Sequence, residues 1–295
     1  MRLRSITVIL IGTVLAGCAG PPPAATPASP RVASSALPGR ADPVALVGLW
    51  KVSASGEASG AVLRMDGEQQ IMLFRRCIAL TGGWQANRDG QFLAGFDSYS
   101  PDTQGPACTG VEEPADGPDF TPEWLARATG FQAEGTDLLL LDPSGAAVAR
   151  LSPGAKPVTR ADMAAELTGV PQVTAETRQR FDVVAAPLPA GLTPATTATL
   201  LGRWQPDGGD VGAYVEFQDD GQWRGSDGCN GQGGRWSAGP DGSFLAVAGP
   251  STLIGCANVP VAGWMGEARR AGFDGTTLVL LDGAGKDLGR LTKPR

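Results

Sequence analysis

The stretch Gly82-Gly83-Trp84 returns as Gly233-Gly234-Arg235-Trp236 in the second half of the chain. Other matches keep the same order around it: Gly48-Leu49-Trp50 with Gly202-Arg203-Trp204, Cys77 and Cys108 with Cys229 and Cys256, Trp124 with Trp264, and Leu138–Asp142 with Leu278–Asp282. The chain therefore contains two copies of one unit. Features that both copies keep are expected to be scaffold, and features that only one copy keeps are candidates for function.

Each copy is predicted to form a small domain, at residues 46–153 and 199–293. Short β runs alternate with Gly-rich turns, and each copy ends in a hairpin whose turn carries the Asp, Pro and Gly residues that tight turns require. The strands Leu46–Trp50 and Leu200–Trp204 are expected to open the copies. One short helix precedes each final hairpin: Thr121-Pro122-Glu123 predicts a start with Thr121 as N-cap, and the second helix is expected from about Pro260 to Arg270.

The first 17 residues are typical of a secretory signal peptide. Arg2 and Arg4 precede an apolar stretch that is too short to cross a membrane. It ends in Leu15-Ala16-Gly17-Cys18, which resembles the bacterial lipobox and implies cleavage before Cys18 and lipidation of its sulfur. A soluble secreted protein with a chance cysteine is the alternative. Residues 18–45 are rich in Pro, Ala and Ser and are predicted to be a flexible tether.

The predicted location is therefore the bacterial cell envelope, with the chain lipid-anchored and extracytoplasmic. If the cell has an outer membrane, Ala19 after the cysteine favours export to its periplasmic face. The net charge of the chain is −6 and becomes about −8 without the signal peptide. Nucleic acid and anionic lipid surfaces are excluded as partners, because both need a basic patch.

Residues 154–198 join the copies and are predicted to contain one or two helices. Thr159–Asp162 resembles a capping box, and the compositions of Asp162–Leu167 and Ala175–Val184 are helical. A structureless connection of this length would be unusual in a compact protein.

Four cysteines remain after Cys18, an even number that indicates two disulfides in an oxidising compartment. Three connectivities are open to four cysteines, and the repeat selects the one that keeps each pair within a copy: Cys77 with Cys108, and Cys229 with Cys256. Reactive thiols or a metal site built from all four thiolates are the alternative. The chain has neither a C-x-x-C pair nor a histidine to support it.

The second copy carries Ser226-Asp227-Gly228-Cys229-Asn230-Gly231, then Trp236, then Ser251–Cys256. In this order the motifs resemble a META/HslJ-like domain over nearly all of residues 199–293. The first copy is diverged, with Arg75-Arg76-Cys77-Ile78 in place of Asp227-Gly228-Cys229-Asn230. The resemblance implies an α+β fold: two tandem small domains, each a curled, barrel-like antiparallel β-sheet with one short helix. It also implies envelope export and an association with stress tolerance and antibiotic resistance, and it supplies no catalytic residues.

The candidate ligand surface consists of Trp223, Asp227, Asn230 and Gln232. Because Cys77 survives where the polar flanks of the second copy are lost, the segment Gly228–Gly231 is most simply a bend that lets the disulfide close. The paired tryptophans are interpreted as core anchors. Trp223 has only Ile71 as a rough counterpart, which makes it the aromatic residue to test for ligand contact, although a core role is preferred for it too.

Catalysis has little support in this sequence. Without histidine, Ser-His-Asp and Cys-His arrangements and His-ligated zinc are impossible. The carboxylate pairs Glu112-Glu113 and Asp219-Asp220 lack the ligand spacing of a calcium loop. No cofactor or metal is expected. We therefore expect a non-enzymatic, envelope-anchored interaction or stress-tolerance module with an unidentified envelope partner. The alternatives are a small-molecule or glycan binder that uses a pocket in the second copy, and an unrecognised hydrolase built on two carboxylates.

Overall fold

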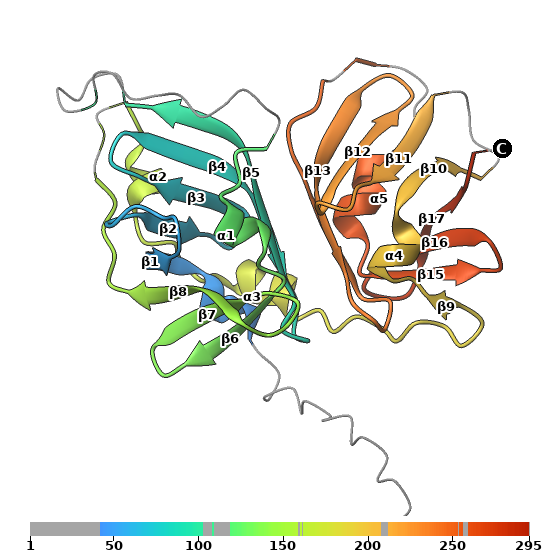
Figure 1. The fold of residues 1–295 in the computed structure, drawn as a ribbon, viewed down its shortest axis with the longest axis horizontal. Helices are drawn as coiled ribbons and strands as arrows, with labels where there is room; N and C mark the ends of the chain where they lie inside the picture. Colours follow the sequence, from blue (N-terminus) through green and yellow to red (C-terminus); the bar gives the residue numbers. More distant parts are fainter. Residues whose placement is uncertain are drawn as a thin grey trace, which may run out of the picture. The chain divides into compact units, whose positions relative to one another are not determined.

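The structure of the protein, a computed structural model, describes residues 42–102, 108, 119–158, 160, 162–207, 212–252, 254–255 and 259–294. The predicted signal peptide, Cys18 and nearly all of the predicted tether lie outside these residues. Residues 38–295 form one compact unit (Figure 1), so the predicted arrangement of two separate tandem domains is not confirmed. Among the described residues, no helix has the length and apolar character needed to cross a membrane.

The first copy forms an antiparallel sheet of eight strands in the order β5-β4-β3-β2-β1-β8-β7-β6. The strands are β1 (Gly48–Ala54), β2 (Val62–Met65), β3 (Gln70–Phe74), β4 (Ile78–Ala86), β5 (Phe92–Pro101), β6 (Gly130–Glu134), β7 (Asp137–Leu141) and β8 (Ala147–Pro153). A 3-10 turn, η1 (Pro43–Leu46), precedes β1, and the one-turn helix α1 (Glu123–Ala126) precedes β6.

The second copy repeats this order as β14-β13-β12-β11-β10-β17-β16-β15, with β9 added at the edge. The strands are β9 (Thr193–Pro194), β10 (Gly202–Pro206), β11 (Ala213–Phe217), β12 (Gln222–Asp227), β13 (Gly231–Ala238), β14 (Phe244–Ala248), β15 (Arg270–Asp274), β16 (Thr277–Leu281) and β17 (Asp287–Thr292). Helix α5 (Val261–Glu267) precedes β15, as α1 precedes β6. The expectation of a mostly antiparallel β fold with short helices is confirmed, and one sheet curls into a half-barrel.

The two openings differ from the predicted strands in the same way. Leu46 ends a 3-10 turn and Leu200 ends the helix α4 (Thr197–Leu200), so that β1 and β10 begin two residues later. The indole N–H of Trp50 donates to the Leu46 carbonyl at 2.8 Å, and that of Trp204 to the Leu200 carbonyl at 2.6 Å. The expected strand starts were wrong because a capped helical turn, stabilised by the tryptophan, precedes each strand.

The final hairpins form as the turn residues predict. The carboxylate of Asp142 accepts the amides of Ser144 and Ala146, and that of Asp282 accepts the amides of Ala284 and Lys286. The glycine three residues after each aspartate has a positive φ, of 84° at Gly145 and 83° at Gly285. Local turn chemistry therefore sets these hairpins in both copies.

The predicted N-cap of the first helix is wrong. Helix α1 begins after Pro122, which has no side-chain capping bond. The hydroxyl of Thr121 instead accepts the backbone N–H of Phe96, at 2.8 Å. Thr121 thus ties the start of α1 to β5 and is not available to cap the helix.

The connecting segment contacts both copies and contains α2 (Ala165–Thr168) and α3 (Ala175–Phe181). Its proposed capping box is not fully described, because residues 159 and 161 lie outside the described part of the chain. Phe181 enters the first core and stacks on Trp84, with ring centroids 5.0 Å apart. Further along, Thr193 and Pro194 pair with β15. The segment therefore covers parts of both copies.

Each sheet encloses its own apolar core. The paired tryptophans Trp50, Trp84, Trp124, Trp204 and Trp236 are buried in these cores, and Trp264 is partly buried against the second. The prediction that they are core anchors holds for the buried five. Trp223 and Ile71, which occupy matching places in β12 and β3, are also buried.

Candidate functional site

Trp223 is an almost fully buried core residue. Its side chain is 1% exposed, and its indole N–H donates to the Val247 carbonyl at 3.0 Å. The bond joins β12 to β14 across the intervening strand β13. The preferred core interpretation agrees with this position.

Asp227 and Asn230 form the bend before β13. The Asp227 carboxylate accepts the backbone N–H groups of Cys229 and Asn230, at 2.8 and 2.6 Å, and the Asn230 side-chain amide at 2.9 Å. The amide of Asn230 also donates to the Ile254 carbonyl, and its oxygen accepts the Ile254 N–H at 2.8 Å. Both side chains are buried and engaged within the protein. Their geometry matches the turn interpretation given to this segment.

A small recess of about 320 Å³ lies beside this bend and brings together three of the four candidate residues, Asp227, Asn230 and Gln232. Within the described part of the chain, the side-chain oxygen of Gln232 is buried without a hydrogen-bond partner. Thr252 and Ile254 line the recess, and residues 253 and 256–258 lie outside the described part of the chain. Because its other polar groups hold the bend, it is the weaker of two candidate sites.

The larger cavity, about 550 Å³, lies between the two copies and was not foreseen. Residues of both copies line it: Gly83, Gly95, Phe96, Asp97 and Asp119 from the first, and Gln222–Arg224, Gly231–Arg235 and Val247–Pro250 from the second. A cavity of this size and mixed polarity falls in the range of small-ligand sites. Its walls are mostly backbone and apolar side chains, with a few charged groups.

Matching strands of the two copies form the contact around this cavity. Strand β5 contacts β13 and β14, and β14 also contacts β4. Leu93 of β5 and Leu245 of β14 occupy equivalent places and join Val247 in one buried cluster. Each copy thus uses the same edge of its sheet to meet the other.

A glycine permits the closest approach. A Cβ atom built on Gly95 would lie 2.8 Å from the Arg235 side chain, whereas one built on Gly83 would lie 3.5 Å from Val247, which is an ordinary contact. Since Gly83 matches Arg235, and Gly95 matches Val247, each copy presents a glycine where the other presents a larger side chain. Gly83, assigned to the scaffold from sequence, therefore also lies at the contact between the copies.

Hydrogen bonds cross the contact at equivalent helix ends. The Gln85 side chain donates to the Gly266 carbonyl of α5 at 3.1 Å, and Arg235 donates to the Ala126 carbonyl of α1 at 3.1 Å. Ala126 and Gly266 both lie two residues after the matched helix tryptophans. The last turn of each helix is therefore bound by the opposite copy.

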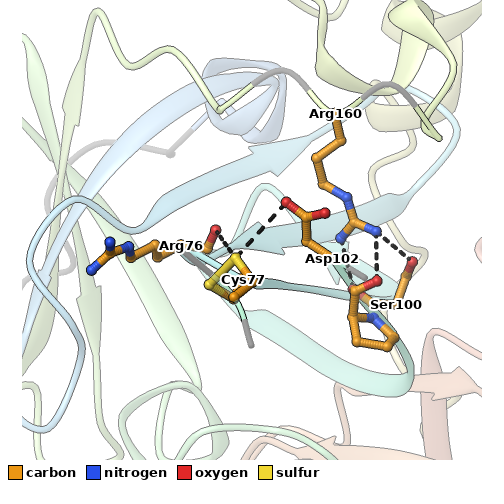
Figure 2. The surroundings of a disulfide bond; sticks show 7 residues. Arg76, Cys77, Ser100, Asp102 and Arg160 are labelled. Atoms are coloured by element: carbon orange, nitrogen blue, oxygen red, sulfur yellow. Dashed lines mark hydrogen bonds between the residues drawn. A yellow bond between two sulfur atoms is a disulfide. The ribbon is translucent and has the colours of Figure 1, made fainter. Parts of the chain in front are cut away.

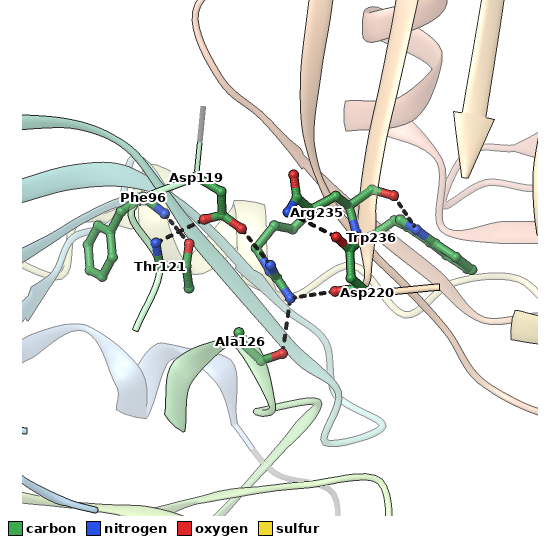
Figure 3. Close-up of polar contacts among 8 residues, drawn as sticks. Phe96, Asp119, Thr121, Ala126, Asp220, Arg235 and Trp236 are labelled. Carbon is green, nitrogen blue, oxygen red and sulfur yellow. Dashed lines mark hydrogen bonds and ion pairs between the residues drawn. The ribbon is translucent and has the colours of Figure 1, made fainter. Parts of the chain in front are cut away.

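Arg235 is the central polar residue of the contact, as Figure 3 shows. Its guanidinium is buried and pairs with Asp119 of the first copy at 2.8 Å. It also donates to the backbone carbonyl of Asp220 at 3.3 Å. Asp119 in turn accepts the backbone N–H of Thr121 at 2.9 Å. The charge of Arg235 is thereby neutralised at one end of the cavity.

Asp97 also lines the cavity, and unlike Arg235 it has no partner of opposite charge among the described residues. The register of β4 against β5 shifts between Thr81 and Gly82, which leaves Asp97 as an extra residue in a β-bulge. The matching pair β13–β14 has no such shift. No lysine or arginine of the described residues pairs with Asp97, and burial raises the pKa of this carboxyl above its ordinary value of 3.8 despite a hydrogen bond from Ser98.

The disulfide predicted within the first copy is present. Cys77 and Cys108 are bonded, with Cα atoms 5.4 Å apart, and Figure 2 shows their surroundings. Arg160 of the connecting segment donates to the carbonyls of Ser100 and Pro101, both at 2.8 Å, beside this bond. Cys229 is disulfide-bonded as well. Its predicted partner Cys256 lies outside the described residues, so that pairing stays a prediction.

The diverged motif of the first copy has its own partner. Arg75, which stands in place of Asp227, makes two bonds of 2.8 Å to the carboxylate of Glu57. The indole N–H of Trp124 donates to the same carboxylate at 3.0 Å. Burial alone would raise the pKa of Glu57, but these hydrogen bonds and the charge of Arg75 lower it below 4.5.

One of the two carboxylate pairs lies in the described part of the chain. Glu112 and Glu113 lie outside it, and Asp219 and Asp220 are exposed. Within the described residues, no group of three or more His, Cys, Asp or Glu side chains is placed to hold a metal ion.

Comparisons with family models, with curated proteins and with solved structures find no match to this chain. The resemblance to META/HslJ-like domains is therefore carried by the sequence motifs alone. The class that the fold defines is a two-copy antiparallel β protein with a cavity between the copies.

Sequence reasoning missed this cavity because its residues come from both copies. One residue could have signalled it: Asp97, a carboxylate in the first copy whose counterpart in the aligned strands is Gly249. Of the four sequence candidates, Trp223 and Gln232 line this cavity, whereas Asp227 and Asn230 do not.

Proposed function

We propose that the protein is a non-enzymatic, envelope-anchored lipoprotein that binds a small ligand in the cavity between its two copies. One observation carries this proposal: a cavity of about 550 Å³ is lined by apolar walls and backbone, with one half-buried carboxylate that no described cation neutralises. The signal-like N-terminus and Cys18 support the envelope anchor. The proposed site moves from the second copy, where the sequence suggested it, to the contact between the copies.

The ligand would be held mainly by enclosure. Val247, Ala248 and Phe96 supply apolar contact, and the glycines of β13 expose backbone to the cavity. Placing an unpaired carboxylate in such surroundings costs stability. A bound partner that compensates this charge would stabilise the folded chain.

The sequence-based alternative, a module that docks on another envelope component, has separate support. Four of the five large hydrophobic side chains that are strongly exposed in the described chain lie in the connecting segment: Val158, Val170, Val183 and Val184. This second proposal predicts a protein partner and does not need the cavity.

Native mass spectrometry of the full-length protein, extracted from membranes with mild detergent, tests the first proposal. Gly231 lines the cavity on the same face of β13 as Arg235, and a Cβ atom there meets nothing within 4 Å. Gly231→Trp should therefore fill the cavity without strain. Gly191→Trp is the matched control, because Gly191 is exposed, equally open and away from the cavity.

We expect a non-covalent adduct of about 100–400 Da on the wild type and on Gly191→Trp, and its loss from Gly231→Trp. The denatured mass of the same sample should show acyl chains on Cys18. An adduct unchanged by Gly231→Trp, or none on any form, would reject the cavity as the binding site. A co-purifying protein in place of a small adduct would favour the docking proposal.

A further inference from the structure

Four charged side chains line the cavity, and their pairing differs. Arg235 and Asp119 neutralise one another at 2.8 Å. Arg224 is exposed, and its guanidinium lies against the side-chain amide of Gln218. Solvent screens the charge of Arg224, so it acts weakly on a bound molecule. Asp97 is left as the partly buried charge with no opposite charge beside it among the described residues.

The surroundings of Asp97 leave room beside its carboxylate. Gly249, its counterpart in the second copy, lies against it: a Cβ atom on Gly249 would be 3.1 Å from the Asp97 Cβ and 3.3 Å from its Oδ2. Any larger residue at position 249 would press on the carboxylate. The bulge in β5 and the glycine opposite it together place the Asp97 carboxylate in the cavity wall.

The compensating group that fits this arrangement is a cation that donates hydrogen bonds. A charge-assisted bond to a carboxylate is about twice as strong as a neutral one, and low-dielectric surroundings strengthen it further. An anionic ligand would instead meet an uncompensated negative charge.

We propose that Asp97 is the residue that selects the ligand, and that the ligand class is organic amines, whose ammonium group binds the Asp97 carboxylate while the rest of the molecule fills the cavity. This inference rests on the proposed function of the cavity, and it adds the chemical class of the ligand. Asp97 would be a binding residue with no chemical step assigned to it.

The test is a protein-observed NMR titration with three probes of one shape: benzylamine, benzyl alcohol and benzoate. The proteins are the wild type, Asp97→Asn, and Asp219→Asn as a matched control, since Asp219 is an exposed acid away from the cavity. We expect benzylamine to bind the wild type and Asp219→Asn at least about tenfold more tightly than benzyl alcohol, with no binding of benzoate. Asp97→Asn should lose that preference while it still binds benzyl alcohol.

Equal affinity for benzylamine and benzyl alcohol in the wild type, or a preference that survives Asp97→Asn, would overturn the inference. So would the failure of all three probes to bind. The proposed function is judged separately by the native adduct and Gly231→Trp: an adduct that Gly231→Trp removes would uphold the cavity even if amines are not preferred.

Discussion

Arg75 and Asp227 occupy matching places in the two copies and stabilise different structures. Asp227 binds the backbone of its own bend, whereas Arg75 reaches Glu57, a carboxylate 18 residues earlier whose side chain is 1% exposed. Glu57 also holds the indole of Trp124. The sequence shows only that the first copy lacks the polar pair Asp227 and Asn230. The Arg75–Glu57 pair could not be predicted, because the fold brings Glu57 to Arg75 from a distant part of the chain.

Arg75→Ala should destabilise the protein by about 2–3 kcal/mol, because it leaves the buried Glu57 carboxylate without its cation and with only the N–H groups of Trp124 and Ala58 as donors. The value lies at the low end for buried pairs, since Arg75 is 31% exposed. Chemical denaturation measures it. Arg127→Ala, which removes an exposed pair with Asp142, is the control and should cost less than about 1 kcal/mol. Equal losses in the two variants would contradict the buried-pair interpretation.

The same pair gives a pH dependence. The pKa of Glu57 is lower in the folded chain than its ordinary value of 4.5. Its contribution is therefore complete above pH 4.5 and is lost as the pH falls through the folded-state pKa. The difference in stability between the wild type and Arg75→Ala should shrink correspondingly below pH 4.5.

At the scale of single elements, the stability of Trp223 variants tests whether this side chain of β12 is packed in the core. Trp223→Ala should cost about 3–5 kcal/mol, because it removes a buried indole and its bond to Val247. Trp223→Phe keeps most of the volume and should cost less. Thermal and chemical unfolding measure both variants. A Trp223→Ala protein with wild-type stability would show that the ring is not packed as described.

Elements that depend on local chemistry were predicted well from sequence. The final hairpins follow from aspartate and glycine at fixed turn positions, and the repeat makes each one a check on the other. Elements that depend on distant partners were not predicted. The Thr121 hydroxyl accepts a hydrogen bond from β5 and does not cap its own helix. Leu46 and Leu200 end helical turns, and a tryptophan four residues later donates a hydrogen bond to each of their carbonyls.

At the scale of the whole molecule, residues of both copies line one cavity. The repeat could be recognised from sequence, but not the use of the matched strands β4, β5, β13 and β14 as a contact surface. A glycine in a strand fits a sheet and a contact between sheets equally well, so Gly83 carries no signal that separates the two roles. A site shared between copies is also invisible to a comparison that treats each copy alone.

The most direct measurement of the central claim is a crystal structure of the protein extracted from its own membrane, without added ligand. The proposed function predicts difference density for a small molecule in the cavity, between Asp97 and Gly249 on one side and Gly231 on the other. Water alone in that cavity, or ligand density in the recess beside Asn230, would contradict it.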